Sequence, residues 1–90
     1  MILPKVGDKI YIVSCLRNLC RIGEIKEVIV ELQEIEFTID WILNPSPDGN
    51  KLSYYPFRFK TWPVTFYLEK TDVYVTFDEE EFKRLILEKL

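Results

Sequence analysis

The sequence predicts a small, mainly β protein: a barrel-like sheet of five to six mostly antiparallel strands with one C-terminal α-helix. First, the chain has 90 residues, which is the size of one small domain covering residues 1–90. Second, Val, Ile, Thr, Tyr, Phe and Trp supply 35 of those residues, and these types favour strands. Third, alternating apolar and polar residues recur between turn signals, and helical spacing is found only at the C-terminal end. Closure into a barrel would also protect the edge strands.

Three strands are expected in the first half of the chain. A turn at Gly-Asp leads into the first strand, residues 9–14, and a loop over 15–20 leads into the second, residues 21–32. The apolar positions of the second strand change parity near residues 26–27, which a β-bulge would explain. The third strand, residues 34–43, alternates strictly and is typical of a half-buried antiparallel strand.

The second half begins with a loop and ends with a helix. Residues 44–50 hold two prolines and an Asp-Gly pair, so they form an exposed loop. An aromatic and basic extended segment follows at 54–60, and two strands at 64–68 and 73–77 form a hairpin around a turn at 70–72.

A capped helix is expected after the last strand. Asp78 is placed to accept a hydrogen bond from the backbone N–H of Glu81, and the glutamates that follow Asp78 lie at the positive end of the helix dipole. One helix face should pack on the sheet, and it carries Phe82, Leu85, Ile86 and Leu90.

Composition argues against an enzyme. The net charge is −3, from 12 Lys and Arg against 15 Asp and Glu, and the chain has no His. The commonest general base and metal ligand is therefore missing, and no serine has a histidine to activate it. The carboxylates of Glu34, Glu36 and Asp40 alternate on the outward face of a strand, where such groups are normally solvated. We expect no catalytic residues, no metal and no cofactor.

Cys15 and Cys20 have four residues between them. Without His, two thiols are too few for a zinc site unless carboxylates or a second chain complete it. The favoured interpretation is two ordinary thiols, and the alternative is a disulfide across the mouth of the hairpin loop. A redox enzyme is disfavoured because the C-x-x-C spacing is absent.

The chain is expected to be soluble and cytoplasmic. No apolar run is long enough for a signal peptide or a membrane span. A composition rich in Ile, Glu and Lys with a single Gln also resembles that of thermophile proteins.

The clearest binding signal lies in residues 44–67. This window carries a net charge of +2 and seven of the 13 aromatic residues. Basic side chains interleaved with aromatic rings suit single-stranded nucleic acid, because bases stack on rings while Arg and Lys meet phosphates. The candidate nucleic-acid-binding residues are Tyr54, Tyr55, Arg58, Lys60 and Trp62, together with Arg17 from the earlier loop. The alternating aromatics Trp41, Phe57, Phe59 and Phe66 are instead expected in the core.

Several segments together resemble PUA-like domains, and in particular the EVE branch related to YTH and ASCH domains. The matching segments are Gly-Asp-Lys-Ile-Tyr-Ile at 7–12, Arg-Ile-Gly-Glu-Ile-Lys-Glu-Val at 21–28, Tyr-Pro-Phe-Arg-Phe-Lys at 55–60, and the strand and helix of 73–90. Only six residues precede the first segment, whereas family members usually begin with a strand and a helix, so the chain resembles an N-terminally shortened member.

The resemblance implies a pseudobarrel that binds RNA or a modified DNA base without catalysis. In related domains a flipped base enters an aromatic-lined pocket. The alternative is a protein-interaction or assembly module on a small SH3-like barrel, in which a homodimer would cover exposed apolar surface.

Overall fold

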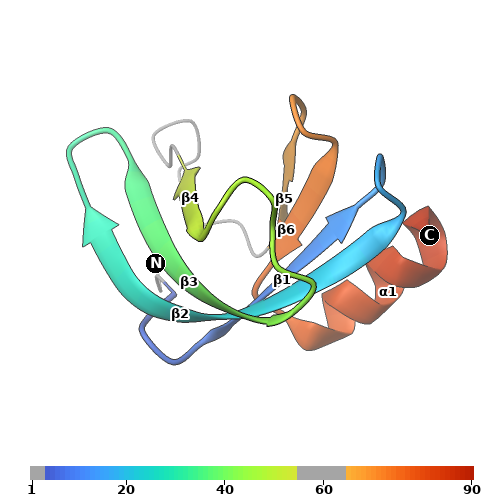
Figure 1. Ribbon diagram of the computed structural model, residues 1–90, viewed down its shortest axis with the longest axis horizontal. Helices are drawn as coiled ribbons and strands as arrows, with labels where there is room; N and C mark the ends of the chain where they lie inside the picture. The colour runs from blue at the N-terminus through green and yellow to red at the C-terminus, as the bar shows by residue number, and fades with distance from the viewer. Residues whose placement is uncertain (1–3, 55–64) are drawn as a thin grey trace.

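Six antiparallel strands form one sheet that curls into a half-barrel, and a single helix packs on its outside (Figure 1). This computed structural model describes residues 4–54 and 65–90. The elements are β1 (Lys9–Ser14), β2 (Leu19–Val30), β3 (Ile35–Leu43), β4 (Lys51–Tyr54), β5 (Thr65–Leu68), β6 (Val73–Thr76) and α1 (Glu79–Lys89). The predicted fold class, a barrel-like β sheet with one C-terminal helix, is confirmed.

The strand order places β1 near the middle of the sheet. The order is β4-β3-β2-β1-β6-β5, so the first four strands form a meander and β6 pairs with the free side of β1. The predicted hairpin of β5 and β6 is present. The sheet curls along this order, so the inner face of the half-barrel is built from all six strands (Figure 1).

The predicted bulge in β2 is confirmed. The register against β3 shifts between Ile25 and Glu27, with Ile25 opposite Ile39 and Val28 opposite Phe37. The extra residue restores the parity of the apolar positions and bends the long strand, as bulges do. Bending here is what allows β2 and β3 to curl around the inner face.

The two faces of the sheet bury different sets of side chains. The inner face holds the larger cluster, formed by Ile10, Ile12, Ile25, Ile35, Phe37, Ile39, Phe66 and Val75. The outer face is covered by α1, whose Phe82 and Leu85 pack with Val13, and Phe82 stacks on Tyr11 with ring centroids 4.8 Å apart. Phe66 was expected in the core and is buried there.

The helix begins as predicted, but its cap differs in detail. The Asp78 side chain accepts from the backbone N–H of Glu80, with an N–O distance of 3.4 Å, and not from that of Glu81. The Glu81 carboxylate pairs with the Arg84 guanidinium one turn later, which lowers the pKa of Glu81. The expected burial of Leu90 is also wrong, because the helix ends there and the side chain is exposed.

The extended segment predicted after the 44–50 loop differs from the structure at its start. Strand β4 starts at Lys51, earlier than the extended segment predicted from residue 54, and most of that segment lies outside the described residues. Within the part of the chain described, no helix has the length and apolar character needed to cross a membrane.

Candidate functional site

The inner face of the half-barrel contains a cavity of about 280 Å³. Its floor is apolar and comes from β1, β3, β4, β5 and β6, and its wall on one side is the loop of residues 44–50. The apolar lining residues are Ile12, Ile39, Leu52, Leu68 and Val73, with Trp41 beside them. A concave site with an apolar floor is the usual form of a ligand pocket.

The first half of the 44–50 loop is fastened by Arg21. The Arg21 Nη1 donates to the backbone oxygen of Asn44 at 2.8 Å and to that of Pro45 at 2.7 Å. The Asn44 side-chain amide donates in turn to the backbone oxygen of Cys20 at 2.9 Å. Asn44 has a φ of 52°, a left-handed conformation that asparagine tolerates better than most residues, so the chain can turn back over the sheet here.

The second half of the loop is fastened by β3. The Trp41 indole Nε1–H donates to the backbone oxygen of Gly49 at 3.0 Å, and the backbone N–H of Ile39 donates to that of Asn50 at 2.7 Å. Trp41 was expected in the core, but it is half-buried, with its ring on the core cluster and on the cavity wall. The loop therefore holds an aromatic side chain at the cavity.

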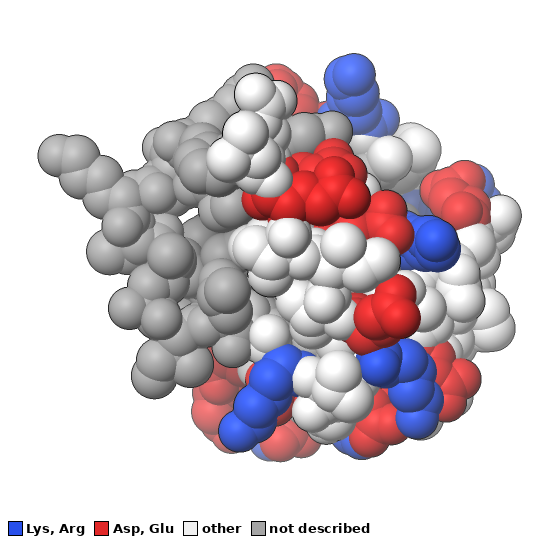
Figure 2. All heavy atoms as spheres, turned by 90° about the vertical axis from the view of Figure 1, so that its left-hand side faces the viewer, with Lys and Arg blue, Asp and Glu red and all other residues white. Residues whose placement is uncertain are grey.

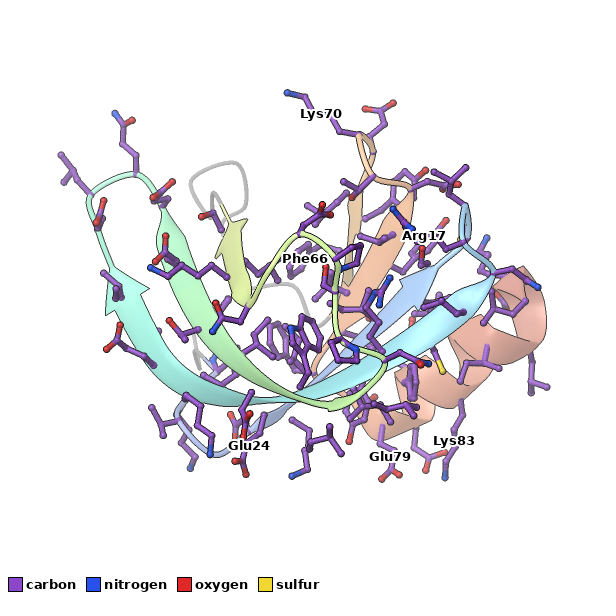
Figure 3. All side chains as sticks on the ribbon, in the orientation of Figure 1. Arg17, Glu24, Phe66, Lys70, Glu79 and Lys83 are labelled. Atoms are coloured by element: carbon purple, nitrogen blue, oxygen red, sulfur yellow. The ribbon has the colours of Figure 1, made fainter. Side chains whose placement is uncertain are left out.

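Two neighbouring hairpin turns form the opposite end of the site. The backbone N–H of Cys15 donates to the backbone oxygen of Asp72 at 3.1 Å and so joins the β1–β2 turn to the β5–β6 turn. Arg17 and Lys70 extend from these two turns, above the open side of the sheet (Figure 3). The Tyr67 hydroxyl donates to the Asp72 carboxylate at 2.7 Å, which raises the pKa of Tyr67 to about 12 and keeps the hydroxyl protonated.

The charge of the cavity is opposite to that of the whole chain. Four cations line it, from Arg17, Arg21, Lys51 and Lys70, against the single carboxylate of Asp48. Lys51 is paired with Glu36 at 3.5 Å, whereas the other three form no ion pair within the described residues. The carboxylates of Glu24 and Glu79 point away from the cavity, on the convex side (Figure 3).

Acidic side chains also gather on another part of the surface. Figure 2, which views the molecule from the left-hand side of Figure 1, shows a group of acidic residues in the middle of that face. The local excess of positive charge in the cavity is therefore a feature of its own lining and not of the molecule as a whole.

The comparisons with known proteins give no relative from which a role could be transferred: no family model, curated protein or solved structure matches the chain. The chemistry of the site has to be inferred from its own residues.

One of the six predicted binding residues lines this cavity, a second lies in β4, and the other four are outside the described residues. Arg17 is part of the lining. Tyr54 is the last residue of β4, paired with Ile35. The other four, Tyr55, Arg58, Lys60 and Trp62, lie outside the described residues, as do the expected core residues Phe57 and Phe59.

The sequence did not identify four lining residues as members of a binding site, namely Arg21, Trp41, Lys51 and Lys70. For Arg21 there was a usable signal. It alternates with Gly23 and Ile25, which face inward, so a charged residue stands at an inward position of a strand. Buried Arg at such a position needs partners, which would have singled it out.

Cys15 and Cys20 are both free thiols. Cys20 packs into the cluster beneath the helix, and the disulfide considered as an alternative is not formed. Among the described residues, no three His, Cys, Asp or Glu side chains are grouped so that they could hold a metal ion.

Proposed function

We propose that the chain is a non-catalytic nucleic-acid-binding module that holds single-stranded RNA or DNA on the inner face of its half-barrel. The observation that carries this proposal is the cation-rich cavity, in which three basic side chains have no acidic partner within the described residues although the net charge is −3. Such a local field attracts a polyanion even when the molecule as a whole is acidic.

The lining offers a partner to each part of a nucleotide. The side chains of Arg17 and Lys70 can meet phosphate oxygens, because both extend from turns at the open side (Figure 3). The Trp41 ring can stack on a base, and the apolar floor excludes water beneath it. A cavity of about 280 Å³ holds about one nucleotide, so the rest of a strand would follow the open groove.

The resemblance to PUA-like domains points to the same class of ligand. It implies RNA or a modified DNA base, and a flipped base is compatible with a cavity of this size that has an aromatic wall. The two arguments share residues, because Ile12, Arg21 and Val73 line the cavity and also belong to segments that resemble the family.

Titration of tryptophan fluorescence with short single-stranded RNA, single-stranded DNA and methylated DNA tests the proposal. We expect quenching at low salt, and a several-fold loss of affinity for Arg17→Gln and for Lys70→Gln. Lys83→Gln is the matched control, because Lys83 is an exposed cation on the helix, on the convex side (Figure 3). Absence of binding at low salt, or equal losses in all three variants, would contradict the proposal.

The alternative function is a protein-interaction or assembly module, and it is favoured by several exposed leucines. Leu16, Leu32 and Leu87 are each more than three-quarters exposed. They lie on two different turns and on the helix, whereas a docking surface needs contiguous apolar residues. Sedimentation of the free protein tests this alternative: a stable homodimer supports assembly, and a strict monomer removes most of the argument for it.

A further inference from the structure

The cavity lining includes a buried arginine whose charge has no counterpart among residues 4–54 and 65–90. Arg21 is only 7% exposed and lines the cavity. Both of its hydrogen bonds within the described residues leave from Nη1, toward the carbonyls of Asn44 and Pro45. A guanidinium also carries N–H donors on Nε and Nη2. These donors have no acceptor, and the guanidinium has no carboxylate, in the described part of the chain.

A buried serine near Arg21 also lacks a side-chain partner in the described part of the chain. Ser14 is 2% exposed, lines the same cavity, and its hydroxyl makes no hydrogen bond with the residues that the structure describes. Ser14 lies opposite Leu19, and Arg21 lies two residues farther along β2, opposite Ile12. Ser14 and Arg21 are therefore diagonal neighbours on one face, about 7–8 Å apart between their backbones. An oxyanion between the two side chains could reach both.

Leaving these groups without partners is energetically unfavourable. A buried polar group without a hydrogen bond destabilises the folded protein, and a buried charge without a counter-charge destabilises it more. An anion with several oxygens would satisfy the remaining Arg21 donors and the Ser14 hydroxyl together. The Arg17 and Lys70 cations line the same cavity and add attraction for such an anion.

We propose that Ser14 and Arg21 form a subsite for a terminal phosphate monoester, so that the module binds nucleic-acid strands by a phosphorylated end. This inference rests on the proposed function and narrows its ligand. An internal phosphodiester continues into strand on both sides and suits an open groove, whereas a terminal phosphate can enter a recess this buried. A monoester also carries about −1.5 to −2 charges at pH 7 and has oxygens that match the guanidinium fork.

The test compares one short single-stranded oligonucleotide in three forms: with a 5′-phosphate, with a 3′-phosphate, and with hydroxyls at both ends. We expect one phosphorylated form to bind at least about tenfold more tightly than the hydroxyl form. Inorganic phosphate should reduce this preference by competition. Equal affinities for all three forms overturn the terminal-phosphate subsite but leave the proposed function standing, whereas no binding of any form overturns the proposed function.

Two variants test whether the preference for a phosphorylated end depends on Ser14 and Arg21. Ser14→Ala removes a hydroxyl that makes no hydrogen bond with the described residues, so we expect unchanged folding and a smaller preference for the phosphorylated form. Arg21→Lys keeps the positive charge but removes the planar set of guanidinium N–H donors. This variant should lose most of the preference for the phosphorylated form. Ser53→Ala, on an exposed position of β4, is the matched control and should behave as wild type. A full preference in Ser14→Ala and Arg21→Lys overturns the assignment to these residues.

Discussion

Gly23 allows three large side chains to meet on the inner face of the sheet. A Cβ atom at this position would lie 2.2 Å from Cγ2 of Ile39, 3.2 Å from Cε3 of Trp41 and 3.3 Å from Cγ2 of Ile10. The first distance is far below van der Waals contact, and the γ-methyl of a β-branched side chain has little freedom to move away. Gly23 is thus needed for close packing and not for an unusual backbone angle.

We predict that Gly23→Ala destabilises the protein by about 1–3 kcal/mol, because the added methyl overpacks the core. Trp41 should also be displaced, and with it the Nε1 hydrogen bond to the loop. Denaturant unfolding followed by tryptophan fluorescence measures both effects. Ser53→Ala is an exposed strand control and should change the free energy of unfolding by less than about 0.5 kcal/mol. A wild-type stability for Gly23→Ala would show that β3 has room to move.

At the scale of elements, α1 contributes to the fold by covering the outer face of β1 and β6. Its two buried residues, Phe82 and Leu85, pack against Val13, and the opposite face of the helix is charged. The cavity lies on the other face of the sheet, so the helix stabilises the strands that carry Ser14 without contributing a side chain to the described lining. The helix thus stabilises one face of the sheet, and the proposed binding site lies on the other face.

This separation predicts different effects for two leucines of the same helix. Leu85→Ala should cost about 2–5 kcal/mol, because Leu85 is almost fully buried and its truncation leaves a void. Leu87→Ala should change stability by less than about 0.5 kcal/mol, because Leu87 is exposed. Thermal and denaturant unfolding measure both. Similar losses in the two variants would mean that the helix does not dock as described.

Most elements could be predicted from the sequence where local pattern and tertiary environment agree. The strict alternation of 35–43 reflects one buried and one solvated face, and the parity change in β2 marks a real bulge. Strand β4 is different, because its four residues follow a Pro-rich loop and are too few to show a period. Its strand state depends on pairing with β3, which local sequence does not reveal.

The site was less predictable because topology assembles it. Arg17 and Lys70 are far apart in sequence and meet only because β6 pairs with β1 and aligns the two hairpin turns. Trp41 follows the alternation of a core residue, but the register shift at Ile22 and Gly23 and the returning loop leave it half-buried on the cavity wall. A one-dimensional pattern cannot show these relations between strands.

For the whole molecule, the unequal distribution of charge decides how a polyanion can bind. The net charge of −3 opposes approach, and acidic residues gather on the face seen in Figure 2. At physiological salt, however, exposed charges are screened beyond about 8 Å, so groups in contact with the ligand dominate. We therefore expect the cations of the cavity to bind phosphates of the proposed ligand and the acidic surface to limit non-specific association.

This balance predicts a shallow dependence of affinity on salt. Each phosphate neutralised on a single strand contributes about −0.7 to the slope of log K against log salt concentration. Arg17, Arg21 and Lys70 lack ion pairs in the described structure, so we expect a slope of about −2 for a terminally phosphorylated strand. Arg17→Gln should make the slope shallower by about 0.7, and Lys83→Gln should leave it unchanged. Fluorescence titrations across a salt series measure the slope. A slope near zero would mean that phosphates are not bound, and a much steeper slope would mean that cations beyond these three contribute.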